Sequence, residues 1–136
     1  MTKKYFALLA ILTTVLCFCA CSDNQNKNDV FTNNMFIDVD SITYYDFNGT
    51  KYTSYDKNII EKVASMLVSA KLEELDKDKY LEGSYSFILN KQDGTSIDVC
   101  LGSVIGYDYK QYYTDNIKDN YIVELINKIK ETSEDI

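Results

Sequence analysis

Two carboxylates, Asp38 and Asp40, stand two residues apart in a segment with strand-like alternation. Alternate residues of a strand point to the same side, so these carboxylates are expected to lie about 7 Å apart on one face. Such a pair could bind a metal ion or serve as the acid and base of a glycosidase-like hydrolase. Acidic residues on the solvent side of a half-buried strand are the favoured interpretation. We interpret Asp76, Asp78 and Glu82, which alternate with lysines, as part of a solvated turn.

The 136-residue chain contains no His, Arg, Trp or Pro, and its net charge is −7. Without histidine there is no Ser-His-Asp or Cys-His pair and no histidine-based zinc site. Without arginine the chain lacks the side chain that grips phosphate with two hydrogen bonds. An acidic chain also lacks the basic surface on which nucleic-acid affinity rests. The composition therefore predicts a protein that is not an enzyme, holds no metal or cofactor and binds no nucleic acid.

Cys100 lies between Val99 and Leu101 in a predicted strand, so its side chain points to the face opposite theirs. A reactive thiolate needs a nearby positive charge, and here only a lysine or a helix dipole could supply it. A small, half-buried packing residue is therefore the favoured interpretation of Cys100.

Tyrosine is abundant, and 11 of the 12 tyrosines follow Cys21. In the predicted strand Ile105–Thr114, Tyr107, Tyr109 and Tyr113 are expected to share one face, with Tyr112 opposite. These three residues form a candidate binding surface, because tyrosine offers rigid amphipathic area to sugars, peptides or proteins. Ordinary strand packing, together with a composition typical of A+T-rich coding, is the favoured alternative explanation of the tyrosines.

The chain begins with the pattern of an export signal. Lys3 and Lys4 form a short basic region, residues 5–20 are almost entirely apolar, and a polar stretch follows Cys21. These features are typical of a secretory signal peptide. The apolar run is shorter than the roughly 20 residues that comfortably span a bilayer, so a permanent transmembrane helix is the second choice.

The sequence Phe18-Cys19-Ala20-Cys21 resembles the lipobox of bacterial lipoproteins. The resemblance implies that residues 1–20 are removed and that Cys21, diacylated on its sulfur, becomes the first residue of the mature chain. Cys19, with Leu16 three positions upstream, is the alternative attachment residue. The resemblance further implies an extracytoplasmic protein held on the cell membrane by a diacylglycerol or palmitate anchor, of the type found in Gram-positive bacteria.

Removal of the leader leaves 12 lysines against 21 acidic side chains, a net charge of −9. Anionic lipid head groups repel such a surface, so the acyl chains are expected to provide the membrane contact. Residues 21–34 are predicted to be the lipidated cysteine and a polar tether, and residues 35–136 a single domain with a frayed C-terminus.

Alternation in Ile37–Phe47 predicts a half-buried strand with Ile37, Val39, Ser41, Thr43, Tyr45 and Phe47 on one face and Asp38, Asp40 and Asp46 on the other. Asn48-Gly49 predicts a type I′ turn into a return strand, Lys51–Tyr55. A second hairpin is predicted from strands Tyr85–Asn90 and Thr95–Leu101 joined at Asp93-Gly94. In that hairpin Ile97, Val99 and Leu101 share one face.

Two amphipathic helices are predicted. Asp56 is expected to cap the first, whose apolar stripe is Ile59, Ile60, Val63, Met66, Leu67 and Ala70. This helix ends within residues 71–75, unless Leu72 and Leu75 begin a strand. Asp119 is expected to cap the second, Asn120–Glu131. The order ββ-α-βββ-α predicts an α+β fold: an antiparallel sheet of four to five strands with both helices on one face.

Taken together, the chain resembles in plan the small uncharacterised lipoproteins of Gram-positive bacteria, a resemblance that implies no particular activity. The favoured hypothesis is a binding domain for an envelope protein, peptide or glycan. The alternatives are a carboxylate-dependent cell-wall hydrolase that uses Asp38 and Asp40, and a structural subunit of an envelope complex or an immunity or inhibitor lipoprotein.

Overall fold

The computed structural model describes residues 29–82 and 84–133. Its strands are β1 (Val39–Tyr45), β2 (Lys51–Ser54), β3 (Glu73–Glu74), β4 (Tyr85–Lys91), β5 (Ser96–Leu101), β6 (Val104–Tyr107) and β7 (Lys110–Tyr113). The helices are α2 (Lys57–Ser69) and α3 (Asp119–Glu131), with short 3-10 turns η2 (Asn33–Phe36) and η3 (Lys77–Lys79).

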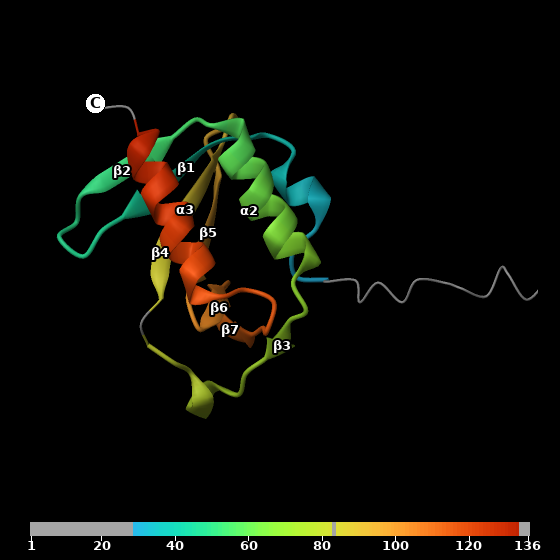
Figure 1. Cartoon of the computed structure of the whole chain (residues 1–136). Coiled ribbons are helices and arrows are strands. Elements are labelled where there is room, and N and C mark those ends of the chain that lie inside the picture. Colours follow the sequence, from blue (N-terminus) through green and yellow to red (C-terminus); the bar gives the residue numbers. More distant parts are fainter. Residues whose placement is uncertain (1–28, 83, 134–136) are drawn as a thin grey trace, which may run out of the picture.

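The seven strands form one sheet in the order β2-β1-β4-β5-β6-β7-β3, and all neighbouring strands are antiparallel. Helices α2 and α3 lie on the same face of this sheet (Figure 1). The predicted α+β class is therefore confirmed, whereas the predicted number of four to five strands is wrong. The additional strands are β3, which follows α2, and the second half of a hairpin in the tyrosine-rich segment.

The tyrosine-rich segment Ile105–Thr114 was predicted as one strand and is a tight hairpin. Strands β6 and β7 pair from Val104–Tyr113 to Tyr107–Lys110, and only Asp108 and Tyr109 connect them. Both connecting residues have positive φ, 49° and 60°, which is the geometry of a type I′ turn. The sequence carries no Asn-Gly or Asp-Gly signal here, and a bulky residue such as Tyr109 rarely adopts positive φ.

The turns at Asn48-Gly49 and Asp93-Gly94 are hairpins, as predicted, but of another type. Only the glycines have positive φ, 80° at Gly49 and 84° at Gly94, whereas a type I′ turn needs two such residues. Each loop contains three residues, one more than a type I′ hairpin loop. The loops are closed by hydrogen bonds from Asp46 N to Thr50 O (3.0 Å) and from Lys91 N to Thr95 O (2.9 Å). This is the three-residue loop in which a left-handed glycine forms a bulge.

Val39 packs against the core as predicted, but from Ser41 onward the inner face of β1 is the reverse of the prediction. Ile42 and Tyr44 lie in the hydrophobic core, and a register shift between Val39 and Ser41 marks a bulge in the pairing with β4. Ser41 and Thr43 point to the face that the helices leave uncovered, where they are nevertheless buried. The prediction counted Ser41 and Thr43 as inner residues, whereas burial of the larger Ile42 and Tyr44 removes more apolar area from water.

A small hydrogen-bond network satisfies these polar side chains. The hydroxyls of Thr43 and Thr53 lie 3.0 Å apart, and Asn90 Nδ2 donates to Ser41 Oγ and Thr43 Oγ1, both at 3.1 Å. Among the described residues, none of the buried side-chain nitrogen or oxygen atoms lacks a hydrogen-bond partner. The network therefore joins three neighbouring strands on the uncovered face.

The helices bury most of each stripe that the sequence predicts. Helix α2 ends at Ser69, before the predicted end within residues 71–75, and the alternative of a strand in that segment is confirmed by β3. Helix α2 begins after Asp56, whose carboxylate accepts a hydrogen bond from Asn58 N at 2.8 Å, and α3 begins after Lys118, one residue before the predicted cap. The buried residues are Ile59, Ile60, Val63 and Leu67 from α2 and Ile122, Leu125, Ile126 and Ile129 from α3. They pack against a sheet face that includes Phe87, Leu89, Ile97, Val99 and Leu101. None of the helices in the described ranges is long and apolar enough to cross a membrane.

Both ends of the described chain are fastened to the sheet. Phe31 is fully buried, and its ring centroid lies 4.9 Å from that of Tyr107 on β6. At the other end, Ser54 and Thr132 share a 2.6 Å hydrogen bond, and Thr53 N donates to Ser133 Oγ at 3.0 Å. Residue 31 was assigned to the tether by sequence, so the packed domain extends further toward the N-terminus than predicted. The predicted leader and Cys21 lie outside the described residues.

Candidate functional site

The sheet is incomplete between β5 and β6. These strands pair at only two positions, Leu101–Ile105 and Cys100–Gly106, after which the β6–β7 hairpin turns at Asp108. The earlier part of β5, from Ser96 to Val99, therefore has no partner strand on that side within the described chain. A gap thus opens between β5 and the tip of the hairpin.

The phase of the β4–β5 ladder shows which backbone groups face this gap. The hairpin closes with the hydrogen bond from Lys91 N to Thr95 O, so the hydrogen-bonded pairs with β4 fall at every second residue from there, at Ile97 and Val99. The N–H and C=O groups of Ser96 and Asp98 consequently point away from β4. They form a free strand edge along the gap.

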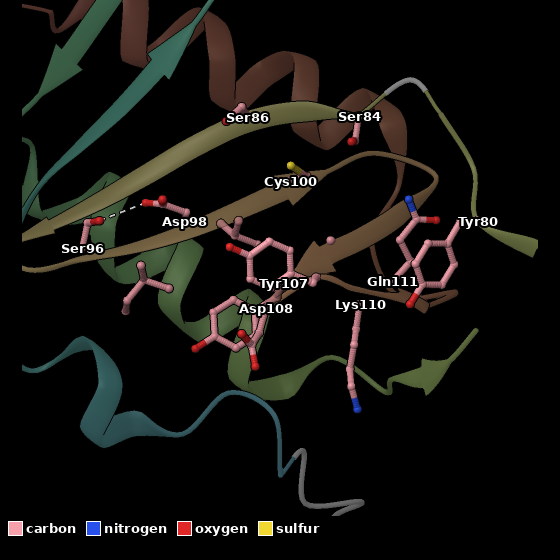
Figure 2. A pocket seen from close by; sticks show the side chains of 14 residues that line it. Tyr80, Ser84, Ser86, Ser96, Asp98, Cys100, Tyr107, Asp108, Lys110 and Gln111 are labelled. Carbon is pink, nitrogen blue, oxygen red and sulfur yellow. Dashed lines mark hydrogen bonds between the residues drawn. The ribbon is translucent and has the colours of Figure 1, made fainter. Parts of the chain in front are cut away.

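A cleft of about 580 Å³ occupies the gap. Figure 2 shows Ser96, Asp98 and Cys100 along β5, with Tyr107, Asp108 and Lys110 of the hairpin across from them and Tyr80 and Gln111 at one end. Its volume falls within the range of about 300–1,000 Å³ that is usual for ligand pockets. The lining combines hydroxyls, carboxylates, a thiol and aromatic rings from several separate segments.

At one end of the cleft, the side chain of Gln111 forms two hydrogen bonds with the backbone of the loop that contains Tyr80 and Leu81. Gln111 Nε2 donates to the carbonyl of Leu81 at 2.8 Å, and Gln111 Oε1 accepts from Leu81 N at 2.7 Å. This double hydrogen bond fixes the loop that carries Tyr80 against β7. This end of the cleft is therefore attached to the sheet through Gln111, although the loop itself is not part of the sheet at Tyr80 and Leu81.

The strands meet closely where the cleft ends. A Cβ atom at Gly106 would lie 3.1 Å from Cys100 Cβ, closer than nine in ten real Cβ contacts. Glycine therefore permits the close approach of β6 to β5 at their last pair. Cys100 is a half-buried free thiol that faces away from the core residues Val99 and Leu101, as predicted.

The charges around the cleft are unbalanced. Lys110 Nζ lies 2.9 Å from Glu74 Oε2 on β3, and this hydrogen bond raises the pKa of Lys110. Asp98 accepts a hydrogen bond from Ser96 Oγ at 2.9 Å, and Asp108 is exposed at the turn. With Lys110 matched by Glu74, the carboxylates of Asp98 and Asp108 leave the cleft negatively charged. No group of three His, Cys, Asp or Glu side chains within residues 29–82 and 84–133 could hold a metal ion.

The structure separates the three residues of the predicted tyrosine surface. Tyr107 and Tyr109 line the cleft, but Tyr107 is half-buried against Phe31, whereas Tyr109 is 98% exposed at the turn. Tyr113 is 51% exposed on β7 and does not line the cleft. Tyr112 is buried, and burial raises the pKa of its hydroxyl. The hairpin explains the separation, because residues on its two strands do not follow the alternation of one strand.

The other candidate residues lie away from the cleft. Asp38 precedes β1, and the exposed Asp40 accepts a 3.2 Å hydrogen bond from Ser41 Oγ. Asp76 pairs with Lys79 at 2.8 Å on an exposed turn. Neither group adds to the cleft lining.

Sequence reasoning missed Asp108, Lys110 and Gln111 as parts of a site. The available signal was the set of small polar residues on the outer face of the β4–β5 hairpin, Ser86, Ser96 and Asp98, among which Ile88 is the large apolar exception. That set alone carries no information about where β6 leaves β5.

A second hollow, of about 510 Å³, lies where α2 approaches the segment before α3, with Lys62, Met66, Ile117 and Tyr121 in its lining. Burial raises the pKa of Tyr121 here. The part of its lining that comes from α2 and α3 offers a ligand side chains alone, because helices satisfy their own backbone groups. The cleft beside β5 offers backbone groups as well.

Comparison of the chain with models of protein families, with curated proteins and with solved structures finds no match.

Proposed function

We propose that the protein is an extracytoplasmic lipoprotein, anchored to the cell membrane through Cys21, whose domain is a non-enzymatic binding module. The anchor rests on the resemblance of residues 18–21 to a lipobox, and the observation that carries the binding role is the cleft between β5 and the β6–β7 hairpin. It combines a ligand-sized volume with a free strand edge, two carboxylates and aromatic rings. Chemistry of the usual nucleophile–base kind has no histidine to draw on, which favours binding over catalysis.

A tryptophan placed at the rim of the cleft tests the binding role. The chain contains no Trp, and Tyr109 is 98% exposed at the turn, so Tyr109→Trp introduces a single tryptophan beside the cleft, which can be excited selectively. The full-length protein in detergent is titrated with soluble muropeptides and with short peptides of neutral, acidic and basic composition. Binding in the cleft predicts a saturable shift of the emission with at least one of these classes.

The matched control is Val123→Trp, on the exposed side of α3. Its emission should stay constant in the same titrations. Equal responses from the two reporters would indicate nonspecific association, and no response from Tyr109→Trp to any of the ligands would contradict the binding role of this cleft.

The anchor is tested separately by metabolic labelling with a fatty-acid analogue. The wild-type chain and a Cys19→Ser variant should incorporate the label into the membrane fraction, and Cys21→Ser should not. Label retained by Cys21→Ser would contradict the proposed attachment site, and label lost only from Cys19→Ser would assign it to Cys19.

A further inference from the structure

We infer that the ligand of the cleft is an extended, positively charged peptide segment that pairs with the free edge of β5 at Ser96 and Asp98. This inference rests on the proposed binding function and names the class of ligand. It follows from the backbone groups, the space and the charges that meet in the gap.

The first argument is the unpaired edge. Ser96 and Asp98 direct their N–H and C=O groups into the gap, in the phase fixed by the β4–β5 ladder. An extended peptide satisfies such groups by adding a strand, with main-chain hydrogen bonds that are independent of its side chains. The backbone groups of these two alternate residues can pair with a short extended segment of the peptide, in either the antiparallel or the parallel direction.

The second argument is the space left by the hairpin. If the β5–β6 register continued beyond Cys100–Gly106, Asp98 would lie opposite Asp108. Instead Asp108 has a φ of 49° and begins the turn, so β6 stops before that position. The resulting volume of about 580 Å³ accommodates several peptide residues. The ligand would take the place that a longer β6 would otherwise fill.

The third argument is charge. Asp98 on β5 and Asp108 on the hairpin both line the cleft, and Lys110 is held by Glu74 at 2.9 Å. A lysine side chain of the ligand placed between the two carboxylates would gain two favourable interactions, whereas a glutamate there would meet two like charges. The rings of Tyr80 and Tyr109, which also line the cleft, offer apolar area to the aliphatic part of such a side chain.

The test uses full-length protein carrying Tyr109→Trp and the probe acetyl-Lys-Val-Lys-Val-Lys-amide. The parent peptide is compared with two versions N-methylated at alternate residues, in the two possible phases. Methylation blocks one edge of the strand, so one phase should bind at least about tenfold more weakly while the other retains most of the affinity. Replacing each Lys by Glu should abolish binding.

On the protein, Asp98→Asn and Asp108→Asn should each weaken the probe several-fold, and the loss should shrink at high salt. Glu131→Gln, a charge change at the exposed end of α3, is the matched control and should leave the affinity unchanged. Circular dichroism verifies that each variant is folded.

Equal affinities for the parent and both methylated peptides would overturn edge pairing, and equal binding of the Lys and Glu peptides would overturn the charge preference. A response of the reporter to muropeptides or neutral peptides alone would leave the binding function standing and overturn this inference. A reporter that answers to none of these ligands would overturn both.

Discussion

The ring of Phe31 lies against the ring of Tyr107, with 4.9 Å between their centroids and an angle of 50° between their planes. Phe31 enters from the N-terminal side of the domain, and Tyr107 is the last residue of β6 before the turn. The contact therefore ties the start of the folded chain to the hairpin that forms one side of the cleft. A ligand that displaces this hairpin would therefore also change the contact between Phe31 and Tyr107.

Phe31→Ala should lower the free energy of unfolding by about 3–5 kcal/mol, because it removes a fully buried aromatic side chain and leaves a cavity. Phe47→Ala is the matched control, since Phe47 is 89% exposed, and it should cost less than about 1 kcal/mol. Urea denaturation followed by circular dichroism measures both. Similar losses from the two variants would contradict the placement of Phe31 in the core.

Gly106→Ala should destabilise the protein by about 1–3 kcal/mol, because the added methyl group would lie 3.1 Å from Cys100 Cβ. The cost should persist in a Cys100→Ala background, which keeps that Cβ, and fall below about 1 kcal/mol in Cys100→Gly, which removes it. Denaturation of the three single variants and the two double variants completes the comparison. If Gly106→Ala costs the same stability in all three backgrounds, the added methyl group does not clash with Cys100 Cβ.

Thr43→Val should cost about 1–3 kcal/mol, because it leaves the buried hydroxyl of Thr53 without its 3.0 Å partner. The same step made in a Thr53→Val background should cost less, since no hydroxyl is then stranded. Thermal unfolding of the two single variants and the double variant measures the difference. Strict additivity would mean that the two hydroxyls do not interact.

The Asp93 carboxylate accepts hydrogen bonds from Thr95 Oγ1 at 2.6 Å and from Thr95 N at 2.9 Å. These two hydrogen bonds lower the pKa of the Asp93 carboxyl. A lowered pKa in the folded state means that Asp93 stabilises the fold above its unfolded pKa and that this contribution is lost as the pH falls through the folded value. NMR titration of the Asp93 carboxyl should show the lowered pKa, and Thr95→Val should move it back toward its usual range. An unchanged titration in Thr95→Val would mean that the side-chain hydrogen bond has no effect.

The sequence predicted those elements whose local signals and packing agree. Gly49 and Gly94 mark two hairpins, and the stripes that include Val63 and Ile126 mark the two helices, because turn geometry and helical periodicity are local properties. The core face of β5 followed from the same alternation, since Ile97, Val99 and Leu101 are large and apolar.

Features that depend on tertiary packing escaped prediction. The turn at Asp108 and Tyr109 has no glycine, and the surrounding sheet sustains its positive φ values. Phe31 lies in a stretch that is polar except for Val30, so no periodic pattern predicted that it would fill the core beside Tyr107. The cleft depends on this turn, on the packing of Tyr107 against Phe31 and on the point at which β6 separates from β5. Only the assembled sheet shows where the two strands separate.

The bond between Thr53 N and Ser133 Oγ joins residues 80 positions apart, and the Ser54–Thr132 bond joins residues 78 apart. Strand β2 therefore completes these contacts only after residues 132 and 133 have been synthesised. Contacts of such long range form late, because the intervening chain must be ordered first. A nascent chain that has not yet reached Thr132 therefore lacks both hydrogen bonds that fasten β2 to the end of α3.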